Sequence, residues 1–177
     1  MLTEPLPTTL DIRKAAARGV SVSGTLKALD LQRFRLLLAD DEGIVSARFA
    51  FSRDEENRYL VTVSVAVDVN VTCQRCLEPV AKHVASENTL AVVWSDEQAA
   101  HLPRHLEPLI ASEEASSLWD LVEDELILTL PPFSYHEIED CNQIEADFSA
   151  PPAEQSKAQE KPNPFDVLAQ LKPGNKH

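Results

Sequence analysis

A strict alternation of valines is the feature that most constrains this chain. Valine occupies every second position from Val61 to Val71, with small or polar residues between. Side chains of a β-strand point to opposite faces with a period of two, so this pattern predicts a half-buried strand. Cys73 continues the phase of the valines and opens the segment Cys73-Gln74-Arg75-Cys76. The sequence therefore predicts a strand that ends in a turn carrying two thiols.

Several other segments carry strand signals, and polar turns separate them. The segments predicted to be strands are Val20–Leu26, Phe34–Ala39, Ile44–Phe51 and Val80–Trp94. Strands joined by short turns favour an antiparallel arrangement over alternating parallel units. The expected fold class is therefore α+β, with an antiparallel β-meander sheet or partial barrel and a few helices.

Helix signals precede and follow the strands. Asp11–Arg18 reads as a helix that Thr9 or Asp11 can cap and Gly19 can end, and Ser95 begins a capping box for a short helix before Pro103. After the second helix we expect a linking stretch through Pro108. Ser116 or Ser117 can then cap a third helix, which Pro131-Pro132 ends. We expect one α+β domain over residues 1–148, with strands at about 20–94 and an acidic helical part at about 95–148.

The end of the chain has a different composition. Residues 149–162 are rich in Pro, Ala, Glu and Gln and should form a flexible linker. Residues 163–172 are predicted to form a short amphipathic helix, in which Phe165, Leu168 and Leu171 make one apolar stripe. A helix this short is marginal alone, so it should bind either its own domain or a partner, and the stripe does not choose between them.

Charge is distributed unevenly along the 177 residues, which carry a formal net charge of −13. Residues 1–90 contain 11 basic and 12 acidic side chains, whereas residues 91–177 contain 5 and 17. The second half should repel phosphate, so direct contact with nucleic acid would fall to arginines of the first half. The candidates for such contact are Arg33, Arg35, Arg48 and Arg53. A mixed-charge solvated surface is the competing interpretation.

Three consecutive carboxylates, Glu123, Asp124 and Glu125, lie in the third predicted helix. Consecutive helical residues diverge in direction, so they make a poor pair for acid–base catalysis and a poor metal cage. We expect them to form a solvated helix face that can contact a basic partner.

The cysteines suggest a metal site. Two Cys separated by two residues can supply half of a tetrahedral zinc site, and His136 with Cys141 could supply the other half. About 60 residues separate Cys76 from His136, which is far longer than in zinc fingers, so three buried cysteines without a metal remain an alternative. Thiol–disulfide catalysis by Cys73 and Cys76 is less favoured, because Leu77-Glu78-Pro79 and a strand follow where thioredoxin-like sites have a helix.

Other signals of catalysis or membrane insertion are weak. The chain has four glycines and neither a Gly-rich phosphate loop nor a nucleophile elbow. No apolar run reaches the roughly 20 residues needed to cross a bilayer, and the first residues do not resemble a secretion signal. A cytoplasmic protein that is not an enzyme, without contact to a membrane, is the expectation.

Taken together, the motifs resemble those of one bacterial family. The relevant segments are the Cys73-Gln74-Arg75-Cys76-Leu77-Glu78-Pro79 turn, the acidic stretch Val122-Glu123-Asp124-Glu125-Leu126 running on to Pro131, His136 with Cys141, and the closing stretch from Lys161-Pro162-Asn163-Pro164-Phe165 to Lys172. In this combination and order the chain resembles the YceD family, the large ribosomal RNA subunit accumulation proteins.

The resemblance implies a non-enzymatic role in synthesis, processing or stability of 23S rRNA during large ribosomal subunit biogenesis. It also implies that Cys73, Cys76, His136 and Cys141 correspond to the family's cysteines and histidine, which favours one structural Zn²⁺. With the charge pattern, it suggests that a basic ribosomal protein or an rRNA-processing factor is the partner, and that 23S rRNA is contacted directly or indirectly. The alternatives are a thiol–disulfide oxidoreductase and a zinc-binding adaptor unrelated to ribosomes.

Overall fold

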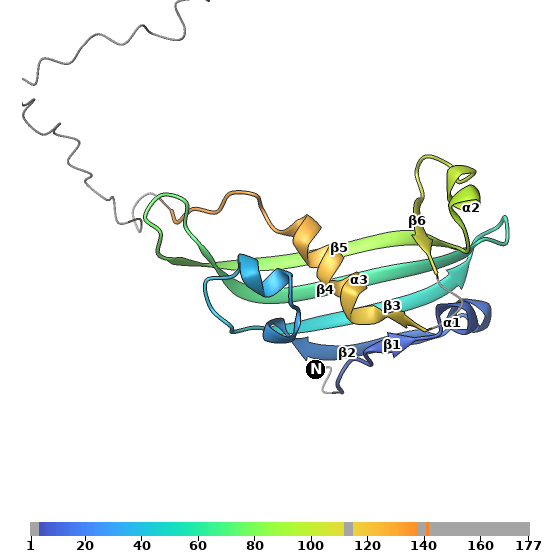
Figure 1. The fold of residues 1–177 in the computed structure, drawn as a ribbon, viewed down its shortest axis with the longest axis horizontal. Coiled ribbons are helices and arrows are strands. Elements are labelled where there is room, and N and C mark those ends of the chain that lie inside the picture. Colours follow the sequence, from blue (N-terminus) through green and yellow to red (C-terminus); the bar gives the residue numbers. More distant parts are fainter. Residues whose placement is uncertain (1–3, 112–114, 138–140, 142–177) are drawn as a thin grey trace, which may run out of the picture. The chain divides into compact units, whose positions relative to one another are not determined.

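The computed structural model describes residues 4–111, 115–137 and 141, and these residues build a five-stranded sheet covered on one face. The sheet has the order β2-β3-β4-β5-β6 (Figure 1), and its first four strands form an antiparallel meander. These strands are β2 (Ser21–Lys27), β3 (Ile44–Arg53), β4 (Tyr59–Thr72) and β5 (Pro79–Val93). The α+β class with an antiparallel meander is therefore confirmed.

The valine strand is the centre of the sheet and of the core. All six valines from Val61 to Val71 are at most 5% exposed, and Cys73 is completely buried at the end of the same row. Val63 lies opposite Phe49 of β3 and Asn88 of β5, so β4 has a neighbouring strand on each side. The residues between the valines have small or polar side chains, and these point to the other face of the sheet. The alternation thus fixes which face is buried.

Two helices and a small two-stranded pair cover the apolar face. Helix α1 (Ile12–Arg18) contacts β3 and β4, and α3 (Leu118–Thr129) lies across β4 and β5 (Figure 1). Strand β1 (Thr9–Leu10) pairs with β7 (Ser116–Ser117), which ties the start of the chain to the start of α3. The predicted caps are present, because Asp11 accepts from the Lys14 N–H and Ser117 from the Asp120 N–H.

The segment predicted as a strand at Phe34–Ala39 is not one. The chain forms two 3-10 helices there, η1 (Ala28–Asp30) and η2 (Phe34–Leu37). Phe34 is fully buried, whereas Leu36 is 80% exposed. The segment is therefore apolar in sequence, but only part of it is buried. The strand prediction rested on apolarity alone and lacked an alternating pattern, and it was wrong for that reason.

The stretch expected to be a linker also contains structure. After α2 (Asp96–Ala100), which Ser95 caps, residues Glu107–Ile110 form β6. Strand β6 runs parallel to β5, with Glu107 opposite Leu90, so the meander ends in one parallel strand. Pro108 lies within β6, where an edge position tolerates proline.

The remaining predictions on organisation concern other parts of the chain. The predicted linker at 149–162 and the predicted helix at 163–172 lie outside the described residues, and the domain boundary at residue 148 remains a prediction. Within the described ranges, the helices are too short or too polar to reach across a lipid bilayer.

Candidate metal centre

A tight turn between β4 and β5 presents the two cysteines of the Cys-x-x-Cys segment. The Cys73 N–H donates to the Glu78 carbonyl and the Leu77 N–H donates to the Cys73 carbonyl, both at 2.9 Å. Leu77 has a φ of 64°, a left-handed conformation that usually falls to glycine. This backbone path turns the chain back on itself, so both Cys73 and Cys76 are buried.

The segment after α3 reaches the same turn. The Gln74 N–H donates to the Ser134 carbonyl at 2.8 Å, which places His136 beside Cys76. The His136 Nε2 lies 2.9 Å from the Pro79 carbonyl and its Nδ1 lies 3.3 Å from the Cys76 Sγ. A carbonyl can only accept, so Nε2 donates to it, and in the neutral imidazole this leaves Nδ1 with a lone pair toward the sulfur. A histidine that ligates a metal commonly has its other ring nitrogen fixed in this way.

The four predicted residues come together in one cluster. The Sγ atoms of Cys73, Cys76 and Cys141 and a ring nitrogen of His136 lie within 4.8 Å of one another. The Cys73 and Cys141 sulfurs are 3.9 Å apart. In a tetrahedral zinc site two sulfur ligands would be about 3.8 Å apart and a sulfur and a nitrogen about 3.5 Å apart. The cluster can therefore bind a metal ion without large rearrangement.

The thiols have different protonation properties. Burial acts to raise the pKa of Cys73, but the backbone N–H groups of Cys76, Arg75 and His136 outweigh it and lower that pKa to about 5. Burial raises the pKa of Cys141, and its contacts with the Cys76 and Cys73 side chains add to the effect. Cys73 is thus a thiolate at neutral pH, as a metal ligand must be.

A disulfide-exchange site needs a different setting. All three cysteines are free thiols, and the Cys73 and Cys141 sulfurs are 3.9 Å apart. Within the described residues the Cys-x-x-Cys turn leads into β5, so Cys73 does not begin a helix as thioredoxin-like cysteines do. The geometry favours metal binding over thiol–disulfide catalysis.

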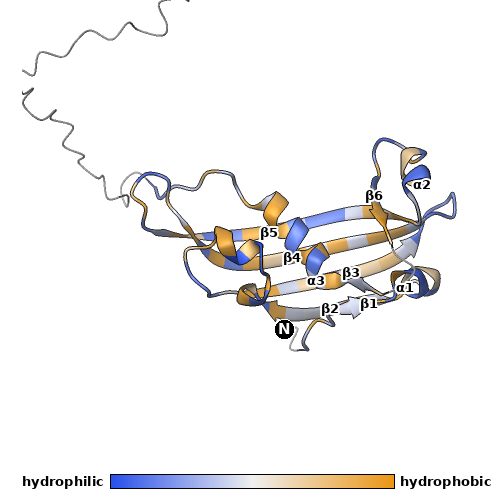
Figure 2. Cartoon of the chain, in the orientation of Figure 1, coloured by the Kyte–Doolittle hydropathy of each residue, from blue (hydrophilic) through white to orange (hydrophobic). Residues whose placement is uncertain are grey.

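The carboxylate run does not form the expected solvated face. Glu123 is 5% exposed and Glu125 9%, and only Asp124 of the three is exposed. Glu123 accepts from the backbone N–H groups of Arg33 and Phe34 and pairs with the Arg33 guanidinium at 2.8 Å. Parts of α3 are coloured as hydrophilic in Figure 2, but hydropathy does not show burial, and two of the three carboxylates are buried. Sequence reasoning missed this because Arg33 lies 90 residues from Glu123.

Stability should respond to pH through Glu123. Burial acts to raise the pKa of this carboxyl, but the N–H groups of Phe34 and Arg33 and the Arg33 guanidinium lower it below its ordinary 4.5. The carboxylate therefore stabilises the fold above pH 4.5, and that contribution is lost as pH falls through the lower folded pKa. We expect urea unfolding of wild type and Glu123→Gln to differ at neutral pH, and the difference to shrink steadily below pH 4.5. A difference that is constant with pH would contradict this assignment.

The four candidate arginines lie in different elements and have different surroundings. Arg33 is engaged by Glu123 and Asp124, and Arg35 lies 3.7 Å from Asp41. Arg53 donates to Asn57 and to the Tyr59 hydroxyl, whereas Arg48 is exposed on the polar face of β3. A role in nucleic-acid binding remains a prediction for these residues.

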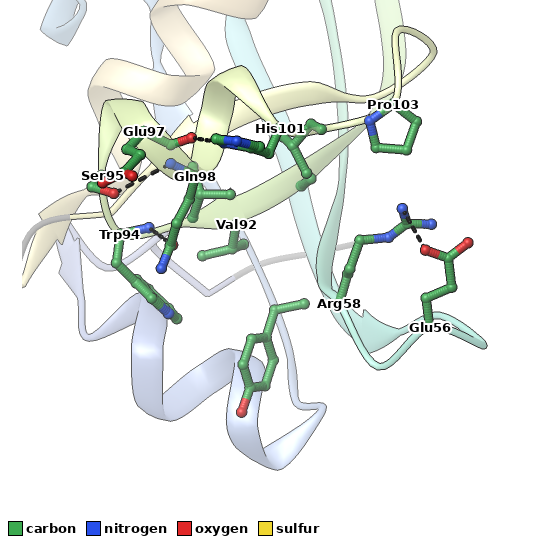
Figure 3. Close-up of a pocket in the computed structure, with 13 residues that line it drawn as sticks. Glu56, Arg58, Val92, Trp94, Ser95, Glu97, Gln98, His101 and Pro103 are labelled. Atoms are coloured by element: carbon green, nitrogen blue, oxygen red, sulfur yellow. Dashed lines mark hydrogen bonds and ion pairs between the residues drawn. The ribbon is translucent and has the colours of Figure 1, made fainter.

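A surface pocket of about 690 Å³ lies where β5 meets α2 (Figure 3). Its polar side chains are engaged in local bonds: the His101 Nδ1 donates to the Glu97 carbonyl, and Arg58 pairs with Asp54 and Glu56. Trp94 is covered by the Arg13 guanidinium at 4.5 Å. These contacts give the polar and aromatic residues of the pocket structural roles, so the pocket is not chosen as the candidate site.

Comparison with known proteins gives a consistent result. A family model described as "Large ribosomal RNA subunit accumulation protein YceD" matches residues 61–172. A Haemophilus influenzae protein with the same name is 35% identical over 170 residues, which cover 94% of this chain and 96% of that protein. No solved structure matches the chain. The matched region contains the Cys-x-x-Cys turn, His136 and Cys141, and the chain belongs to the YceD family of large ribosomal RNA subunit accumulation proteins.

Proposed function

We propose that this protein is a non-enzymatic cytoplasmic factor for the accumulation of 23S rRNA during biogenesis of the large ribosomal subunit. One observation carries the proposal: the likeness to the Haemophilus influenzae protein extends over nearly the full length of both chains. Two described polar clusters join parts of the fold: Glu123 holds η2 against α3, and the cysteine cluster joins the β4–β5 turn to the segment after α3.

The cluster of Cys73, Cys76, His136 and Cys141 holds one structural Zn²⁺ in this proposal. Three sulfurs and one imidazole are a donor set that zinc prefers, and four protein ligands leave no open position for a substrate. The bond from His136 to the Pro79 carbonyl and the low pKa of Cys73 both support ligation. The ion would fasten the residues after α3 to the sheet.

Protein partners are proposed as the main route of action. A net charge of −13 attracts basic proteins, including ribosomal proteins and rRNA-processing factors, and does so over a long range at low salt. Asp124, which is exposed on α3, and the apolar stripe predicted for Phe165, Leu168 and Leu171 are candidate contacts, whereas buried Glu123 supports the fold beneath. Direct rRNA contact through Arg35, Arg48 or Arg53 is the second route.

Complementation tests the proposal. A Haemophilus influenzae strain that lacks its YceD protein should show a reduced ratio of 23S to 16S rRNA, and expression of this chain should restore the ratio. Affinity capture from the complemented strain, with proteins and RNA read from the same sample, then identifies the partner. An unrestored ratio despite normal protein levels would overturn the proposal.

A further inference from the structure

Strand β5 leaves a long backbone edge open. It extends from Pro79 to Val93, but β6 lies beside only Leu90–Val93 (Figure 1). Among the described residues, no strand pairs with the outer side of Ala81–Thr89. Nine residues at about 3.3 Å each give an open edge of about 30 Å, which exceeds the length of a typical strand.

The hydrogen bonds at the two ends of β5 show which groups face outward. The Glu78 carbonyl bonds across to Cys73, on the β4 side, whereas the Val93 carbonyl bonds outward to the Ala111 N–H. Backbone groups alternate in direction along an antiparallel pair, so even-numbered residues bond to β4 and odd-numbered residues face away. The outward N–H and C=O groups of the open edge thus belong to Ala81, His83, Ala85, Glu87 and Thr89. The Pro79 carbonyl before them is already taken by His136.

Uncompensated carboxylates gather at one end of this edge. The Asn88 side-chain amide donates to Glu107 at 3.3 Å and to Glu125 at 3.4 Å, and the Ser86 hydroxyl donates to Glu125 at 3.1 Å. The ion pairs within the described part of the chain include neither glutamate. Glu125 is only 9% exposed, and a buried carboxylate without a cation is costly. A cation brought to this place would relieve that cost.

We propose that an extended basic segment of a partner protein adds to the sheet as a strand along Ala81–Thr89. Its backbone pairs with the outward groups of the odd-numbered residues, and a lysine or arginine next to Asn88 pairs with Glu125 and Glu107. Unprotected edges of this length attract other strands, and the carboxylates select a basic one. A second copy of this chain fits less well, because two chains of net charge −13 repel each other. This inference rests on the proposed function, since it specifies the kind of protein partner.

A synthetic peptide of alternating lysine and valine, about ten residues long, is a suitable probe. Binding to the full ¹⁵N-labelled chain should slow amide exchange at Ala81, His83, Ala85, Glu87 and Thr89. The even-numbered amides between them, which already bond to β4, should not change. A peptide N-methylated at every valine keeps the charge but loses backbone donors, and it should not protect these amides.

Two variants separate the backbone from the charge. Ala85→Pro removes one outward N–H and no bond to β4, and should weaken peptide binding at least about tenfold. Glu125→Gln keeps the shape of the side chain and should weaken binding about tenfold while reducing its dependence on salt. Asp120→Asn is the matched control, because it removes one carboxylate charge from an exposed position on the same helix and should leave binding unchanged.

Three results would overturn the inference. These are equal protection by the N-methylated peptide, unchanged binding by both Ala85→Pro and Glu125→Gln, and protection of the odd-numbered amides that rises with protein concentration without peptide. The last result would show a second copy on the edge. Each result concerns only the edge, because the 23S to 16S rRNA ratio in the complementation assay tests the proposed function by itself.

Discussion

Cys76→Ser is expected to release the metal from the purified protein and to lower its melting temperature by about 10 °C. Serine is a poor zinc ligand at neutral pH, and the remaining three ligands would hold the ion far more weakly. Without the ion, the turn before β5 and the segment around His136 are joined only by hydrogen bonds, such as that from the Gln74 N–H to the Ser134 carbonyl. Elemental analysis should find about one zinc per wild-type chain and little in the variant. Thermal unfolding followed by circular dichroism measures the change in stability.

A pair of histidine variants provides the control for this experiment. His136→Asn should behave like Cys76→Ser, because it removes another ligand. His83→Asn should keep both the metal and the melting temperature, since His83 is exposed and bonds to Asp68 on the polar face of the sheet. Wild-type protein that is folded and free of metal, with a melting temperature that Cys76→Ser does not change, would exclude the zinc site.

Glu123→Ala is expected to lower the free energy of unfolding by about 3–5 kcal/mol. The carboxylate accepts three hydrogen bonds, two from the N–H groups of Arg33 and Phe34 and one from the Arg33 guanidinium. Removing it leaves the N–H of buried Phe34 without a partner and opens a gap between η2 and α3. Urea unfolding at neutral pH measures the change.

The neighbouring carboxylate tests whether burial is the cause. Asp124 also pairs with Arg33, at 2.8 Å, but half of its side chain is exposed, so Asp124→Ala should cost less than about 1 kcal/mol. Glu123→Gln should fall between the two alanine variants, because its amide oxygen can still accept from the backbone. Equal losses for Glu123→Ala and Asp124→Ala would mean that surface charge, rather than the buried bonds, is responsible.

Features set by neighbouring residues could be predicted from the sequence. The valine alternation gave the centre of the sheet, and Asp11 and Ser117 marked the starts of α1 and α3, because strand phase and helix caps depend on residues a few positions apart. The failures involve distant contacts. The conformation at Phe34 and the burial of Glu123 are set by one contact between residues 89 positions apart, which no local pattern can show.

The cluster of Cys73, Cys76, His136 and Cys141 was predicted from donor chemistry and from the resemblance to the YceD family rather than from spacing. The long separation between Cys76 and His136 is explained by the fold, because β5, α2, β6 and α3 all intervene before the chain returns to the turn. Donor types identified the four residues, but only the topology accounts for the interval. Neither local patterns nor donor types revealed β6, whose pairing with β5 is parallel and therefore requires a long connection.

The hydrogen bond between His136 and the Pro79 carbonyl connects the candidate metal centre to the first residue of β5. Pro79 begins the strand whose edge is open, so an ion that holds His136 also holds the near end of that edge. If the two proposals hold and zinc binding raises the affinity for the added strand, strand addition must raise the affinity for zinc by the same factor. Under both proposals, a chelator that removes the ion would therefore weaken binding of the lysine–valine peptide to the edge.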